Sequence, residues 1–272
     1  MDDKKCGYLY IATGDKYIRE AAISVKSLRK VDKKAHITLV TNKKLEISLS
    51  SLFDEIKICP DSSNKWHGGL AYKVKHIYRD SPYENTFFID TDTYFYESCR
   101  ELFELLDYFD ICMANAPVSI DAYINKKLVK GLTTYNTGVI LYRKNKINER
   151  LFEKWYEFYE IDLREGTVKI DGDQTPFMEA FAKSESKVHI LSNVWNARIP
   201  YYINLTGSVK IAHGRYGSYE SNYEKLRARI NKSTDNRCWH PMQARCFYGR
   251  KPSTLSKLKK ALKKLLIPRQ SQ

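Results

Sequence analysis

In the sequence of 272 residues no window approaches about 18 uninterrupted apolar residues, which argues against a membrane-spanning helix. Its first residues reach Gly14 and Asp15 without the apolar stretch of a secretory signal. Its six cysteines follow no framework spacing, and a chain of this length does not depend on disulfides to hold a core. These absences predict reduced thiols and a cytoplasmic protein.

Signatures of sequence-specific nucleic-acid binding are also absent. The chain has no helix-turn-helix pattern, no aromatic RNA-binding motif and no paired Cys-x-x-Cys, and its 20 tyrosines are dispersed. The net charge of +14 is uneven, because residues 250–272 hold eight lysines and arginines and no acid. Positive charge alone gives only non-specific binding, so we expect no specific nucleic-acid partner.

What the chain does contain is the pattern of an α/β protein, with 43% hydrophobic and 29% charged residues. Strands are predicted at 8–12, 36–40, 56–59, 86–89 and 137–142, and helices at 18–28, 71–79, 99–108 and 149–159. Strands and helices that alternate at this spacing predict a mostly parallel central sheet flanked by helices. We expect one domain over residues 1–249 and a separate basic tail over residues 250–272.

The strongest chemical signal is a pair of carboxylates, Asp90 and Asp92, directly after the apolar run Phe87-Phe88-Ile89. In an extended segment both side chains point to the same side, and the carboxyl end of a parallel strand is where open α/β sheets bind ligands. Oxygen ligands of this kind suit Mg²⁺ or Mn²⁺, especially with substrate phosphates. The ordinary alternative is that the pair only opens a solvated turn.

A second chemistry uses a similar motif. Haloacid-dehalogenase-like phosphatases carry Asp-x-Asp after an apolar strand, with one carboxylate as nucleophile and the other as acid and base. That pattern usually has Thr or Val where this chain has Tyr94, and usually lies on the first strand rather than after three others. This phosphatase is the enzymatic alternative.

Further segments match one family in order along the chain. They are residues 11–17, the Asp90–Asp92 motif, residues 136–141, residues 171–176, Trp195-Asn196 and residues 210–214. In this order they resemble the GT-A fold glycosyltransferases, in particular glycosyltransferase family 8 of the bacterial lipopolysaccharide and lipooligosaccharide type. The resemblance implies a Rossmann-like GT-A fold and transfer of a hexose from a nucleotide sugar, most simply a UDP-sugar, to a glycan or lipid-linked acceptor.

The resemblance also implies a metal site. Asp90, Asp92 and His213 match the family's ligands, and a divalent ion there would neutralise the diphosphate that leaves. A histidine beside two carboxylates favours Mn²⁺ somewhat over Mg²⁺. The ordinary reading of His213 alone is a structural histidine.

Donor binding falls, by the same resemblance, on a larger set of residues: Thr13, Asp15, Tyr17, Lys73, Asp90, Thr91, Asp92, Asn136, Gly138, His213 and Arg215. Lys73 is a candidate phosphate or donor-sugar contact, with Lys75 as its alternative and a solvated helix lysine as the ordinary interpretation. The family's Lys-Pro after the metal-binding histidine is missing, and Arg215, or else Lys210, could supply that charge.

The catalytic assignment follows from Asp173 and Gln174, which resemble the pair that lines the reacting face of the sugar. The resemblance favours retention, with the acceptor attacking from the leaving-group side. In an inverting enzyme Asp173 would be the natural general base.

The tail carries its own signal. Leucines recur at helical spacing through residues 254–267, and five lysines occupy the rest of the surface. Such a basic amphipathic helix is typical of one that lies on an anionic membrane, which predicts peripheral attachment to the inner face of a membrane. Two alternatives stay open: a terminal helix packed on the domain by its leucines, and a non-enzymatic binding module with a basic tether.

Overall fold

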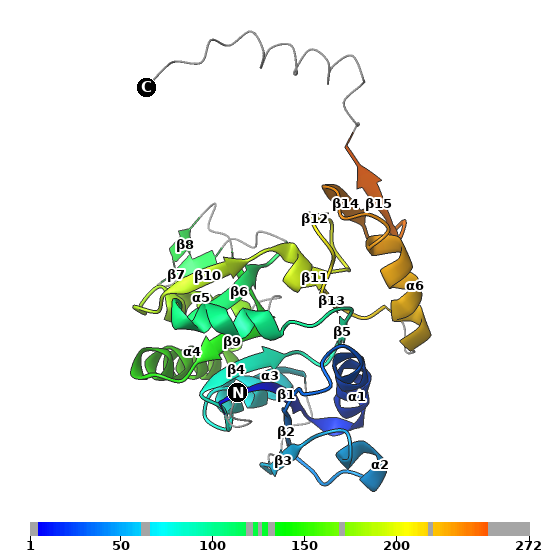
Figure 1. Cartoon of the computed structure of the whole chain (residues 1–272). Helices are drawn as coiled ribbons and strands as arrows, with labels where there is room; N and C mark the ends of the chain where they lie inside the picture. Colours follow the sequence, from blue (N-terminus) through cyan, green and yellow to red (C-terminus); the bar gives the residue numbers. More distant parts are fainter. Residues whose placement is uncertain are drawn as a thin grey trace, which may run out of the picture.

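The computed structural model describes residues 5–60, 66–117, 122–124, 127–129, 134–168, 172–216 and 220–249 (Figure 1). The predicted tail and its amphipathic segment lie outside these residues. The centre of the fold is a seven-stranded sheet in the order β10-β6-β9-β4-β1-β2-β3. Its strands are β1 (Cys6–Ala12), β2 (Ile37–Thr41), β3 (Glu55–Ile58), β4 (Asn85–Ile89), β6 (Ile111–Asn115), β9 (Tyr135–Arg143) and β10 (Val188–Leu191).

The sheet is mostly parallel, as predicted. β1 pairs in parallel with β2 and β4, β2 with β3, and β6 with β10. Only β9 among these strands runs against its neighbours, β4 and β6. The reversal places the first residues of β9 beside the carboxyl end of β4, where the backbone N–H of Asp90 donates to the carbonyl of Gly138 (2.7 Å).

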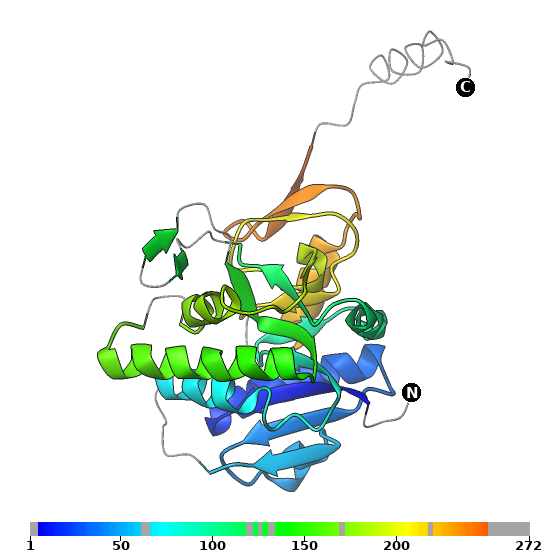
Figure 2. The ribbon, with the colours of Figure 1, turned by 90° about the vertical axis from the view of Figure 1, so that its left-hand side faces the viewer.

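Helices pack on both faces of this sheet and against the smaller sheets. They are α1 (Gly14–Val31), α2 (Ile47–Ser50), α3 (Trp66–His76), α4 (Lys146–Glu165), α5 (Gln174–Phe181), α6 (Glu220–Ile230), and the 3₁₀ helices η1 (Arg100–Asp107) and η2 (Asn193–Trp195). Figure 2 shows α3 and α4 lying side by side across one face. Asn145 caps the N-terminus of α4, where its side chain accepts from the N–H of Asn148, and Gly166 caps the C-terminus in the left-handed conformation.

Alternate residues of the central strands supply two separate cores. In β1, Tyr8 and Tyr10 pack with α1 and η1, while Leu9 and Ile11 face α3, α4 and α5. This alternation is the period of two expected for a strand buried on both faces. The sheet is therefore held rigidly between two helix layers, and the loops at its carboxyl edge can carry a site.

The smaller sheets form a third packed region. They are β11 (Ala197–Arg198), β13 (Ile211–His213) and β5 (Thr93–Phe95); and β12 (Ile203–Leu205), β14 (Arg237–His240) and β15 (Arg245–Tyr248). A separate pair, β7 (Ala122–Ile124) and β8 (Lys127–Val129), lies beside α5. Trp239 is fully buried in a core with α6, and its indole N–H donates to the carbonyl of Ile199 (2.9 Å). Antiparallel pairing of β13 with β5 brings His213 opposite Thr93, next to the Asp90–Asp92 segment.

The predicted strands are all confirmed, each within a few residues of its predicted ends. The helices at 18–28, 71–79 and 149–159 are confirmed as α1, α3 and α4, but residues 99–108 form the 3₁₀ helix η1 rather than an α-helix. β6, β10, α5 and α6 were not predicted. No helix in the described part of the chain has the length and apolar character needed to cross a membrane, and all six cysteines are free thiols.

Candidate active site

A cavity of about 490 Å³ opens where the carboxyl ends of β1 and β4 meet the first residues of β9. Its walls come from most elements around that edge of the sheet: Ile11, Ala12, Thr13, Tyr17, Gly69, Leu70, Lys73, Asp90, Thr91, Asp92, Asn136, Thr137, Asp173, Gln174, Arg198, Tyr201, His213 and Arg215. Cavities of this size suit a small ligand, and this edge of the sheet is where α/β folds bind one.

Two carboxylates and one imidazole converge in this cavity. The Nε2 atom of His213 lies 3.4 Å from an oxygen of Asp92 and 3.7 Å from an oxygen of Asp90. One ligand atom from each of the three lies within 4.8 Å of the other two, so a single ion could contact all three. The two aspartates belong to a turn between β4 and β5 rather than to an extended segment, yet both still point at the histidine.

The imidazole of His213 is fixed by a chain of amides. Its Nδ1 lies 2.7 Å from the side-chain oxygen of Asn196, and the amide of Asn196 donates to Asn136 (2.9 Å). Asn136 in turn donates to Gln174 (3.2 Å). Since the amide oxygen of Asn196 can only accept, Nδ1 carries the proton and Nε2 presents its lone pair to the two aspartates.

The environment of this cluster favours a neutral His213 and shifts the pKa values of the two aspartates in opposite directions. Burial lowers the pKa of His213, and the nearby charge of Arg198 lowers it further, against the opposite effect of Asp92. Burial acts to raise the pKa of Asp92, but His213 and Arg198 outweigh it and hold that pKa below its usual value. Desolvation raises the pKa of Asp90 despite Lys73. A neutral imidazole beside carboxylate oxygens is a metal-ligand set.

Gly138 makes this approach possible. A Cβ atom at residue 138 would lie 2.2 Å from Cε1 of His213 and 2.4 Å from an oxygen of Asp90. No side chain larger than hydrogen fits there unless both of these groups move. The lack of a side chain at Gly138 thus leaves the space that the side chains of His213 and Asp90 occupy.

Lys73 and Asp173 form a buried ion pair behind the cluster. The Lys73 ammonium lies 2.5 Å from Asp173 and 3.8 Å from Asp90, and Asp173 also accepts from the hydroxyl of Thr137 (2.9 Å). Burial alone would lower the pKa of Lys73, but the two aspartates more than compensate and raise it, so the ammonium stays charged. The interpretation of Lys73 as a solvated helix lysine is wrong, because the residue is only 6% exposed.

Two arginines complete the cavity. Arg215 forms two hydrogen bonds to Glu20 (2.8 and 3.0 Å) and lies 3.8 Å from Asp92. Arg198, which sequence reasoning missed, pairs in register with His213 across β11 and β13. Its Nε is buried without a hydrogen-bond partner among the described residues. Its position two residues after Trp195-Asn196 was the one available signal.

Three predicted positions lie elsewhere. Asp15, predicted to bind the donor, is exposed, pairs with Lys43 and does not line the cavity. Lys210 pairs with Glu97 instead of facing the cavity. Lys75 lines a different hollow, between α3 and α4. Of Lys73 and its alternative Lys75, Lys73 therefore reaches the site. Of Arg215 and its alternative Lys210, Arg215 does.

The geometry can be set beside known proteins. No family model and no curated protein matches the sequence. Among solved structures, the chain is similar to the glycosyltransferase GlyE of Streptococcus pneumoniae TIGR4, with a TM-score of 0.54 and 16% identity over 73% of this chain and 48% of that one. It thus spans about half the length of GlyE.

Two other similar structures match over most of their own length. Mouse xyloside xylosyltransferase 1 gives a TM-score of 0.51 and 15% identity over 78% of this chain and 98% of that one. The galactosyltransferase LgtC, solved with donor and acceptor sugar analogs, gives 0.54 and 11% over 77% and 88%. These likenesses show the fold, which is of the GT-A type, with a mostly parallel sheet flanked by helices.

Proposed function

We propose that this chain is a metal-dependent glycosyltransferase that moves a hexose from a UDP-sugar to a glycan or lipid-linked acceptor, with retention at the anomeric carbon. The observation that carries the proposal is the convergence of Asp90, Asp92 and the neutral His213 in a cavity at the carboxyl edge of a GT-A type sheet. The solved structures of similar fold are glycosyltransferases, which favours this function over the phosphatase and binding-module alternatives.

The charges of the cavity support metal dependence. Its three carboxylates, Asp90, Asp92 and Asp173, meet three cations, Lys73, Arg198 and Arg215. An incoming diphosphate therefore finds little excess positive charge. A divalent ion on the two aspartates and His213 would supply charge that matches the diphosphate and stabilises it as it leaves. The donor set suits Mn²⁺ or Mg²⁺, and its nitrogen ligand favours Mn²⁺.

The protein's own residues would hold the rest of the donor. Thr13 and Tyr17 line the cavity beyond β1, where the base and ribose would lie, and Arg215 is 5.9 Å from the Tyr17 ring. Arg198 and Arg215 flank the aspartates, from where their guanidinium groups can donate to phosphate oxygens. Asn136 and Gln174 are hydrogen-bonded to each other and would orient the hydroxyls of the sugar.

The position of Asp173 favours retention. A general base for an inverting reaction must accept a proton from the acceptor hydroxyl. Both oxygens of Asp173 are already engaged, one by Lys73 and one by Thr137. We propose that Asp173 positions Lys73 and that Gln174 faces the reacting carbon, with the acceptor attacking on the leaving-group side.

The proposal is tested by nucleotide release from UDP-, GDP- and CMP-sugars with Mn²⁺, Mg²⁺ or EDTA. We expect slow, metal-dependent hydrolysis of one donor, lost in Asp92→Asn and retained in Asp107→Asn, whose side chain is exposed on η1. Calorimetry with the same donors covers the case in which turnover needs an acceptor. Absence of both turnover and binding with every donor, or phosphate release from sugar phosphates, would reject the transferase.

A further inference from the structure

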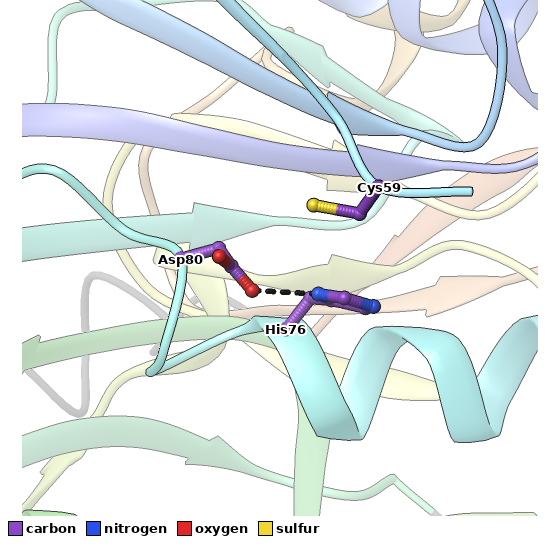
Figure 3. A group of neighbouring side chains, drawn as sticks. All are labelled: Cys59, His76 and Asp80. Atoms are coloured by element: carbon purple, nitrogen blue, oxygen red, sulfur yellow. Dashed lines mark hydrogen bonds and ion pairs between the residues drawn. The ribbon is translucent and has the colours of Figure 1, made fainter. Parts of the chain in front are cut away.

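A second group of metal-type ligands lies at the edge of the sheet, apart from the cavity. Cys59 directly follows β3, His76 is the last residue of α3, and Asp80 lies in the turn after it. Figure 3 shows the three side chains pointing toward one another, the thiol lying over the space between imidazole and carboxylate. One ligand atom of each lies within 4.8 Å of the others, and none of the three lines the candidate active site.

The hydrogen bonds within this group show a conflict over one nitrogen. The Nδ1 atom of His76 lies 2.6 Å from Asp80 and also 3.0 Å from a guanidinium nitrogen of Arg79. Arg79 donates to Asp80 as well (2.9 Å). Nδ1 can donate to Asp80 or accept from Arg79, but it cannot do both at once. The positively charged guanidinium of Arg79 thus lies where the lone pairs of His76 Nδ1 and an Asp80 oxygen could together bind a cation.

A metal ion resolves this conflict, because the nitrogen and the carboxylate oxygen would both direct lone pairs at it. The last carbonyls of a helix carry partial negative charge, so the end of α3 favours a cation at this point. Arg79 is 56% exposed on its side chain and is free to move into solvent. The Cys59 thiolate and the Asp80 carboxylate would together neutralise the charge of a divalent ion. This matters because Lys57 and Lys75 already place positive charge near the thiol.

We propose that Cys59, His76 and Asp80 form a site for a divalent transition-metal ion of the zinc type, with Arg79 occupying the ion's place in its absence. Thiolate, imidazole and carboxylate are the ligands that zinc takes in proteins, and three of them leave a fourth position for water. The ion would tie the end of β3 to the end of α3. This proposed site does not depend on the proposed transferase function.

Cobalt provides the test, because a cobalt–thiolate bond gives a charge-transfer absorption that carboxylate and imidazole ligands do not give. We expect Co²⁺ added to the reduced full-length protein to produce this band with one equivalent bound, and Zn²⁺ to abolish it. Cys59→Ser should remove the band, and Asp80→Asn should weaken binding at least about tenfold. The band should persist in Asp92→Asn, which disables the active-site cluster, and in Cys238→Ser, which removes a cysteine two residues from His240.

Absence of a thiolate band in the wild-type protein, or its persistence in Cys59→Ser, would overturn the proposal. Arg79→Ala separates the proposed role of the arginine from a purely structural one. Removing a competing, exposed ion pair should tighten cobalt binding by up to about fivefold. Weaker binding in that variant would show that Arg79 supports the cluster and does not stand in for the ion.

Discussion

Gly138 determines how closely the backbone of β9 approaches His213 and Asp90 in the candidate active site. In Gly138→Ala the new methyl group would overlap both His213 and Asp90, so both groups must shift. Since small displacements of catalytic groups are costly, we expect nucleotide release to fall at least about 100-fold, with weaker Mn²⁺ binding. Gly249→Ala is the matched control, because nothing lies within 4 Å of its added carbon. Unchanged metal affinity in Gly138→Ala would contradict this account.

Arg198 is a charged residue of the cavity with unused hydrogen-bonding capacity. Its Nε is buried and unpartnered among the described residues, which suits a group that waits for an anionic ligand. We expect Arg198→Gln to raise the KM for the donor about 10- to 100-fold, since charge-assisted hydrogen bonds are lost, with a smaller effect on kcat. Calorimetry of UDP with Mn²⁺ should show the same loss.

The exposed Arg227, which lies on α6, offers the control for this measurement through Arg227→Gln. If Arg198→Gln lowers kcat while UDP affinity stays at the wild-type level, the arginine acts on the acceptor or the sugar and not on the diphosphate.

Asp110 joins three elements of the central layer. One of its oxygens accepts from Arg143 (2.9 and 2.6 Å) and Asn145 (2.8 Å), and the other accepts from the backbone of Lys187 (2.9 Å). Burial acts to raise the pKa of Asp110, but these donors outweigh it and lower the pKa. We expect Asp110→Asn to lower the free energy of unfolding by about 2–3 kcal/mol near neutral pH.

The pH dependence of that loss follows from the direction of the shift. A carboxyl with a lowered folded-state pKa contributes stability above its unfolded pKa of about 3.9, and this contribution disappears as the pH falls through the folded value. The difference between wild type and Asp110→Asn, measured by urea unfolding, should therefore shrink below about pH 4. A difference that stays constant down to pH 2 would show that shape and not charge matters here, and Asp107→Asn should show no loss at any pH.

Prediction of the helices and strands succeeded where one element has a long, uniform pattern. β1 and α4 are of this kind. β6 was missed because Cys112, Met113 and Ala114 are apolar without being β-branched, so local propensity does not favour a strand. α5 was missed because Pro176 looks like a helix breaker, although it lies in the first turn, where a proline is tolerated.

The residues of the site that belong to short sequence motifs could be predicted from the sequence. Asp90, Asp92 and His213 stand at matching places in the sequence and meet in one cavity, as expected. Asp15 stands in such a motif too, yet its side chain turns to solvent. Arg198 could not be assigned, because its role depends on the pairing of β11 with β13, two short strands that local pattern does not reveal.

The amphipathic segment 254–267, which lies outside the described residues, remains a prediction about how the whole protein meets its acceptor. Each of its five lysines is expected to contribute roughly 1 kcal/mol at an anionic surface. The full chain should sediment with vesicles that contain anionic lipid, and not with neutral vesicles, and rising salt should release it. Replacing the five lysines by glutamine should abolish this binding while donor hydrolysis in solution stays unchanged. Binding that survives both the substitutions and high salt would indicate that the leucines or another surface hold the protein, and loss of hydrolysis would indicate that the segment packs on the domain instead.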